Sequence, residues 1–145
     1  MSSGHSINIL MVEDNPADIR LAEEAFKYNK LANNLHISKN GVDAMAFLKR
    51  EDDYTEAARP DIILLDLNLP LMSGQEVLAA VKGDPELKSI PVVILTTSEA
   101  EIDILKAYKN HANCYISKPV DFEKFVDVVR QIEGFWFSVV KLPTP

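Results

Sequence analysis

Three acidic side chains stand at the places in this sequence where two apolar runs stop. Glu13 and Asp14 follow the mostly apolar run Ile7–Val12, and Asp66 follows the run Ile62–Leu65. Short continuous apolar runs are typical of strands buried on both faces, as in the middle of a parallel sheet. Open α/β sheets bind their ligands at the carboxyl ends of such strands. We therefore expect these carboxylates to meet at one edge of a sheet.

Two further polar groups follow later apolar runs, Thr96 after Ile90–Leu95 and Lys118 after Asn113–Ile116. Carboxylates placed close together repel one another unless a cation or protons neutralise them. Oxygen ligands with open positions beside them suit Mg²⁺, which also binds phosphate oxygens. A lysine and a hydroxyl would supply a positive charge and a hydrogen-bond donor to those oxygens. Each residue alone is typical of a helix cap or a solvated surface, but their joint placement indicates a magnesium-dependent phosphoryl site.

Five strand–helix units must position these groups. The helices are expected over residues 16 to about 30, 42–49, 74–82, 99–110 and 121–132, and a second strand over Leu35–Ser38. Alternating units of this kind predict a doubly wound α/β fold with a five-stranded parallel sheet and right-handed crossovers. The flavodoxin-like strand order 2-1-3-4-5 fits the count and places the ends of strands 1, 3, 4 and 5 around one crevice.

Composition narrows the class of protein. The 145 residues fit one domain, and the net charge of −7 argues against a surface for nucleic acid. The single cysteine, Cys114, cannot form an internal disulfide. Neither a leader peptide nor an apolar run long enough to span a membrane is visible, so we expect a cytoplasmic protein.

The chain resembles the receiver domains of two-component response regulators. The similarity lies in four motifs: Met11–Asn15, Leu64–Pro70, Val93–Thr97 and Tyr115–Pro119. Thr96 and Lys118 lie 30 and 52 residues after Asp66, as in that family. The resemblance implies a receiver domain over residues 7–133, preceded by a flexible N-terminus (1–6) and followed by a hydrophobic, helical C-terminal extension (134–145). From this sequence, in which no second domain follows, we expect a stand-alone receiver.

The resemblance implies a role for each matched acidic residue. Asp66 would accept a phosphoryl group from a phosphohistidine on a partner histidine kinase. Asp14 and Asp66 would ligate Mg²⁺ directly, Glu13 through water, and Asn68 through its backbone carbonyl. Glu13 replaces an aspartate found in many members of the family, which leaves the metal geometry open.

The resemblance also implies a switch. Lys118 would hold the phosphoryl group, and its bond to Pro119 would be cis. Thr96, with Thr97 beside it, would move toward a phosphoryl oxygen, and Tyr115 would change rotamer with it. The face formed by the fourth helix, fifth strand and fifth helix would then rearrange.

Three other functions fit these residues less well. A magnesium-dependent phosphatase with an aspartyl-phosphate intermediate would need a second carboxylate two residues after Asp66, where Asn68 stands. A flavin-binding protein of the same fold would need a Ser/Thr/Gly-rich loop after the first strand, which is absent. A scaffold without phosphorylation would require the loss of Asp66 or Lys118. The glycines form no nucleotide-binding motif, so the phosphate must arrive on another molecule. We expect the protein to catalyse only its own phosphorylation and dephosphorylation, and not to act as an enzyme on other molecules.

The end of the chain suggests a partner. Residues 134–143 and the connector 54–60 resemble those of single-domain receivers paired with bacterial phytochrome kinases. Similar tails occur in receivers of other kinases, so a non-phytochrome kinase is the alternative.

The last two helices carry more apolar residues than a helix over a sheet requires. Ile102 and Leu105 are expected to form the core stripe of the fourth helix, and residues 122, 125, 126, 129 and 132 that of the fifth. An exposed apolar patch of this size usually marks an interface, so we expect a homodimer. The interface residues would be Ile104, Tyr108, Val128, Phe135, Trp136, Phe137 and Val139.

Overall fold

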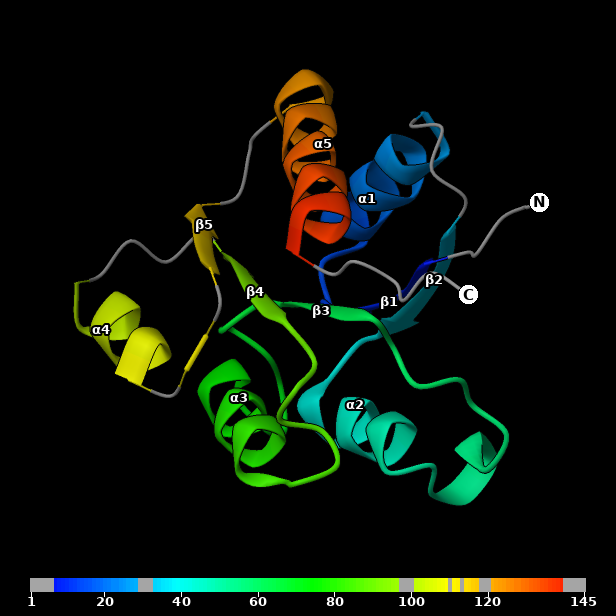
Figure 1. Ribbon diagram of the computed structural model, residues 1–145, viewed down its shortest axis with the longest axis vertical. Helices are drawn as coiled ribbons and strands as arrows, with labels where there is room; N and C mark the ends of the chain where they lie inside the picture. The colour runs from blue at the N-terminus through cyan, green and yellow to red at the C-terminus, as the bar shows by residue number, and fades with distance from the viewer. Residues whose placement is uncertain are drawn as a thin grey trace.

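The computed structural model describes residues 7–28, 33–96, 101–109, 111–112, 114–117 and 121–139. They form a parallel sheet flanked by helices on both faces (Figure 1). The strand order is β2-β1-β3-β4-β5, which confirms the expected topology. The strands are β1 (Ile7–Val12), β2 (Asn33–Ser38), β3 (Ile62–Leu65), β4 (Val92–Thr96) and β5 (Cys114–Ser117). The helices are α1 (Pro16–Tyr28), α2 (Gly41–Leu48), the 3-10 turn η1 (Asp52–Tyr54), α3 (Gly74–Gly83), α4 (Glu101–Lys109) and α5 (Phe122–Val139).

Strand register brings the carboxyl ends of three strands to one edge. Val12 of β1 pairs with Leu65 of β3, and Leu65 pairs with Ile94 of β4. Glu13 and Asp66 follow Val12 and Leu65 directly, and Thr96 stands two residues after Ile94, so the meeting of these expected site residues is a consequence of the pairing.

The sheet separates two apolar cores. Leu10 and Leu65 belong to the core beneath α2 and α3, whereas Met11 and Leu64 belong to the core beneath α1 and α5. Figure 1 shows these two helix pairs on opposite sides of the sheet. Because adjacent residues of a strand point to opposite faces, a strand covered on both faces must be apolar throughout. This explains the continuous run Ile62–Leu65.

Two helix starts follow local sequence signals. Asn15 caps α1, where its Oδ1 accepts hydrogen bonds from the amides of Ala17 (2.9 Å) and Asp18 (3.2 Å). Ser73 caps α3 in a capping box: Ser73 Oγ accepts from the Glu76 amide, and the Glu76 carboxylate accepts from the Ser73 amide. Such caps satisfy amides that the first helical turn leaves without partners.

The expected faces of the last two helices need correction. Val128 is only 7% exposed and belongs to the core, so it does not extend an exposed stripe. Phe122 is instead 37% exposed, and its ring meets Tyr28 edge-on at the end of α1. Helix α5 packs on α1 as well as on the sheet, so its buried face is wider than one stripe.

Helix α4 also differs from its expected pattern. Leu105, expected in the core, is 61% exposed, and Ala107 is the buried residue instead. Helix α5 continues without a break through residue 134 to Val139, so the boundary expected there is not a boundary of secondary structure. Among the described residues, no helix combines the length and apolar character needed to cross a bilayer.

Candidate functional site

Three carboxylates meet at the carboxyl ends of β1 and β3. One ligand oxygen from each of Glu13, Asp14 and Asp66 lies within 4.8 Å of the other two. Glu13 and Asp66 are only 1% and 5% exposed, whereas Asp14 faces solvent. A cation could therefore enter from the side of Asp14 and meet oxygen ligands only, the donor set that hard divalent ions prefer. The residues present fit a divalent metal ion.

Backbone hydrogen bonds carry the sheet one residue beyond the strands and place two of these carboxylates. The Asp66 amide donates to the Val12 carbonyl at 3.1 Å, and the Glu13 amide donates to the Ser38 carbonyl at 2.9 Å. Both acidic residues therefore stand on rigid strand ends, which hold side chains more accurately than loops do.

Two donors converge on one oxygen of Asp66. Thr96 Oγ1 donates to Asp66 Oδ1 at 2.7 Å, and the Asn68 amide donates to the same oxygen at 3.1 Å. Thr96 is fully buried, so its hydroxyl is held in place by its surroundings. The hydrogen bond joins the end of β4 directly to Asp66 of the acidic cluster.

Gly74 is a site residue that the sequence reasoning missed. Its amide donates to the Leu67 carbonyl at 3.1 Å. A Cβ atom at position 74 would lie 2.2 Å from the Asp66 carbonyl oxygen and 2.5 Å from the Leu67 Cα atom. Only glycine lets the first turn of α3 lie this close to the chain after β3. The sequence predicts a helix that starts at residue 74, but nothing in it shows what the glycine approaches.

The structure brings together Glu13, Asp14, Asp66, Asn68 and Thr96, as expected from the order of the strands. Thr97, Lys118 and Pro119 lie outside the described residues. For Tyr115 the structure describes only the backbone, which pairs with Ile94 of β4.

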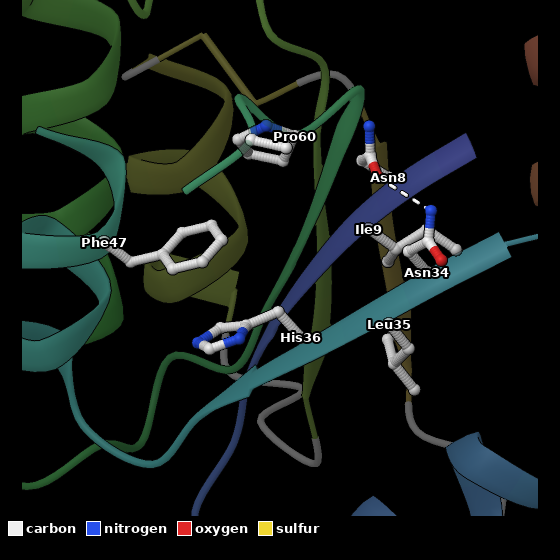
Figure 2. A pocket seen from close by; sticks show the side chains of 8 residues that line it. Asn8, Ile9, Asn34, Leu35, His36, Phe47 and Pro60 are labelled. Carbon is white, nitrogen blue, oxygen red and sulfur yellow. Dashed lines mark hydrogen bonds between the residues drawn. The ribbon is translucent and has the colours of Figure 1, made fainter. Parts of the chain in front are cut away.

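A separate cavity of about 250 Å³ lies at the opposite, amino-terminal edge of the sheet. Asn8 and Asn34 line one side of it and are joined by a hydrogen bond of 3.1 Å; His36, Phe47 and Pro60 line the other (Figure 2). None of the three carboxylates lines this cavity, so it is separate from the acidic cluster.

The fold and the acidic cluster define a class of signalling protein. The family model for the response regulator receiver domain matches residues 9–130, and the chain belongs to this family. The chain is 47% identical over 135 residues to response regulator Rcp1 of Synechocystis sp., an alignment that covers 93% of this chain and 92% of that protein.

Solved structures give the same result. The crystal structure of the phosphorylated cyanobacterial phytochrome response regulator RcpA matches with a TM-score of 0.89 and 47% identity, over 97% of this chain and 100% of that one. The Mn²⁺-bound form of response regulator Rcp1 matches with a TM-score of 0.86 and 46% identity, over 95% and 99% of the two chains. The bacteriophytochrome response regulator RtBRR matches with a TM-score of 0.77 and 40% identity, over 97% and 86%. The chain is thus a response regulator receiver similar to phytochrome response regulators.

Proposed function

We propose that this protein is a phosphorylation switch in which Asp66 accepts a phosphoryl group from a phosphohistidine of a partner histidine kinase. The observation that carries the proposal is the cluster of Glu13, Asp14 and Asp66, with Thr96 hydrogen-bonded to the carboxylate of Asp66. A buried carboxylate beside a metal site and a hydroxyl donor has what phosphoryl transfer asks of a protein, positioning and charge neutralisation.

The transfer is an in-line displacement at phosphorus. A carboxylate oxygen of Asp66 attacks the phosphorus atom, the P–N bond of the phosphohistidine breaks, and its electron pair leaves with the imidazole. The product is a 4-aspartylphosphate. Mg²⁺, held by Asp14 and Asp66, by Glu13 through water and by the Asn68 carbonyl, would supply positive charge to the phosphoryl oxygens. Lys118 is proposed as the second cation for those oxygens, with a cis bond to Pro119.

Switching follows from the hydrogen bond of Thr96. In the unphosphorylated site, the Thr96 hydroxyl donates to Asp66 Oδ1. A phosphoryl oxygen on Asp66 would be a more highly charged acceptor, so the hydroxyl would turn toward it and move the end of β4. The movement would pass to α4, β5 and α5, with Thr97 and Tyr115 responding to it.

The partner proposed is a phytochrome histidine kinase. This proposal rests on the similarity to phytochrome response regulators, one of which, RcpA, is 47% identical to this chain. A kinase of another sensory class is the alternative. Phosphotransfer from a purified phytochrome kinase to this protein should be complete within minutes, while a non-phytochrome kinase of equal activity should transfer far more slowly; equal rates would contradict the phytochrome assignment.

A phosphatase acting on other molecules is less well supported, because the residue two positions after Asp66 is Asn68, which cannot serve as a general acid or base. The phosphatase would be favoured if the protein released inorganic phosphate steadily from a small acyl phosphate. The amount released would have to exceed the protein concentration many times, and the release would have to be faster than switching.

The central test is phosphate uptake at Asp66. Incubation with acetyl phosphate and Mg²⁺, followed by intact-mass spectrometry, should add one phosphate to the wild-type protein. Asp66→Asn should add none, because an amide is not a nucleophile for phosphorus, and EDTA should abolish uptake by the wild type. Replacement of Mg²⁺ by Mn²⁺ should preserve it. Undiminished labelling of Asp66→Asn would overturn the proposal.

A further inference from the structure

Helix α4, which the proposed switch moves, has few apolar anchors among residues 103–109, the part whose side chains the structure describes. Among its described side chains only Ala107 is fully buried, while Leu105 and Tyr108 are 61% and 50% exposed. An alanine removes much less apolar surface from water than a leucine or a phenylalanine does. Individual polar contacts therefore contribute a larger share to holding α4 than they do in the helices that cover the two cores.

One such contact joins α4 to α3. The Gln75 side-chain Nε2 donates to the backbone carbonyl of Asp103, in the first turn of α4, at 3.1 Å. The contact is partly buried, so water competes with it less than at an exposed surface. The other end of the same amide, Gln75 Oε1, is buried and has no hydrogen-bond partner among the described residues. It is uncommon for a buried side-chain amide to have a partner for its NH₂ group but none for its oxygen.

The residue before Gln75 connects this contact to the phosphorylation site. Gly74 is bonded through its amide to the Leu67 carbonyl, and its Cα lies against the Asp66 backbone so closely that no side chain fits. Asp66 is also bonded to Thr96, the last residue of β4. Two routes thus lead from Asp66 toward α4: one through Thr96 and the chain that follows β4, the other through Gly74 and the side chain of Gln75.

We propose that Gln75 is a positioning residue that holds α4 in the arrangement of the unphosphorylated protein and so sets how readily phosphorylation moves it. This inference rests on the proposed function. Movement of Thr96 toward a phosphoryl group shifts the chain that leads into α4, whereas α3 stays docked on its core. The bond from Gln75 to Asp103 therefore opposes the movement and must lengthen or break.

Loss of the bond should bias the protein toward its activated arrangement. A typical neutral hydrogen bond shifts an equilibrium by roughly 2- to 10-fold. Gln75→Met keeps the length of the side chain but removes both the donor and the unpartnered oxygen, so the bond to Asp103 is lost without leaving a buried amide that has no partner. Gln75→Lys restores a donor that can reach the Asp103 carbonyl.

The test measures binding of beryllofluoride, a phosphoryl mimic, in the presence of Mg²⁺ by isothermal titration, with hydrogen exchange of the α4 amides as a second readout. Gln75→Met should bind beryllofluoride roughly 2- to 10-fold more tightly than wild type, and its α4 amides should exchange faster before beryllofluoride is added. Gln75→Lys should stay close to wild type. The same substitution at the exposed Gln131 of α5, Gln131→Met, is the control and should change neither readout.

The outcomes separate this inference from the proposed function. Wild-type protein that neither binds beryllofluoride nor takes up phosphate at Asp66 overturns the proposed function, and the inference with it. Wild type that binds, together with Gln75→Met of equal or weaker affinity, overturns the role of Gln75 alone. An equal gain in Gln131→Met would also overturn it, since the effect would then not come from the contact with α4.

Discussion

At the scale of single residues, the hydroxyl of Thr96 has two tasks. It stabilises the resting carboxylate of Asp66 through a buried hydrogen bond of 2.7 Å, and it is proposed to follow the phosphoryl group after transfer. A hydrogen bond to a charged group contributes more to stability than one between neutral groups. Replacement of the hydroxyl should therefore affect stability and switching together, while the nucleophile remains.

Thr96→Val replaces the hydroxyl by a methyl group of similar size at a fully buried position. The free energy of unfolding in urea should fall by about 1.5–3 kcal/mol, the contribution of a hydrogen bond to a charged group. Phosphate uptake from acetyl phosphate should persist, but hydrogen exchange in α4 should no longer respond to it. Thr96→Ser, which keeps the hydroxyl, is the control. A valine variant that switches like the serine variant would contradict the role of Thr96.

His36 belongs to an aromatic group far from the proposed phosphorylation site. Its ring stacks on Phe47 with centroids 4.0 Å apart and meets Tyr54 edge-on (Figure 2 shows the first two rings). The Tyr54 hydroxyl donates to Asp43 at 2.8 Å, which raises the pKa of Tyr54. Burial lowers the pKa of His36 below its ordinary value of 6.5, and the negative charge of Asp43 opposes this effect in part.

Stability should consequently depend on pH through His36. Because its folded pKa lies below the unfolded value, the unfolded chain binds more protons at mildly acidic pH. The stabilising contribution is complete well above pH 6.5 and is lost as the pH falls through that value toward the folded pKa. Urea unfolding between about pH 7.5 and 5.5 should show a steeper loss for wild type than for His36→Phe, which keeps the stacked ring. Parallel curves would contradict the prediction.

At the scale of elements, the docking of α3 onto the chain after β3 depends on Gly74. A Cβ atom there would lie 2.2 Å from the Asp66 carbonyl oxygen. This oxygen is a backbone atom, so it cannot relieve the clash by a change of side-chain rotamer. Either the helix or Asp66 would have to move. The same helix ends in Gly83, around which a Cβ would meet nothing within 4 Å.

This contrast gives a matched pair of substitutions. Gly74→Ala should lower the free energy of unfolding by about 1–3 kcal/mol, the usual range for a side chain forced into a packed site, and it should slow phosphate uptake because Asp66 is displaced. Gly83→Ala should change uptake little and raise stability by up to about 1 kcal/mol, since alanine favours the helix. Its φ is not positive, so alanine is not strained there. Equal effects of the two variants in thermal and urea unfolding would contradict the argument.

The elements also show what could be predicted from the sequence. Strand order and the meeting of Glu13, Asp66 and Thr96 were predictable, because continuous apolar runs locate central strands and polar residues mark their ends. Helix faces were less predictable. Whether Val128 is buried and Leu105 exposed depends on how the neighbouring helices pack. The spacing of apolar residues within one helix carries no information about that packing. The role of Gly74 was not predictable for a related reason. The close approach between the start of α3 and the backbone of Asp66 and Leu67 involves two segments, and the sequence of one of them does not show it.

At the scale of the whole molecule, we expect a homodimer formed by α4, β5 and α5. Leu105 and Tyr108 of α4 are large apolar residues that face solvent. Helix α5 extends to Val139, and its last turns carry the sequence Phe135-Trp136-Phe137. Two-fold association is the commonest way to bury such residues.

Sedimentation of the full chain at micromolar concentration should therefore show a dimer. A chain ending at Glu133, and the double variant Leu105→Ser with Tyr108→Ser, should sediment as monomers. Leu71→Ser is the control: Leu71 is 80% exposed but lies between β3 and α3, away from this face. A full-length monomer, with and without phosphorylation, would refute the dimer.

The strand order has a consequence for how the protein is made. β1 lies between β2 and β3, and the Asn8 amide reaches the Asp61 carboxylate 53 positions further along the chain. Synthesis at 5–20 residues per second separates the end of β1 from the end of β3 by roughly 3–11 s. Contacts between such distant segments form slowly and only after the whole intervening chain exists. During that interval the edge of β1 that later pairs with β3 has no partner strand. We expect this edge to be the place where the growing chain most readily binds chaperones or pairs with a wrong strand.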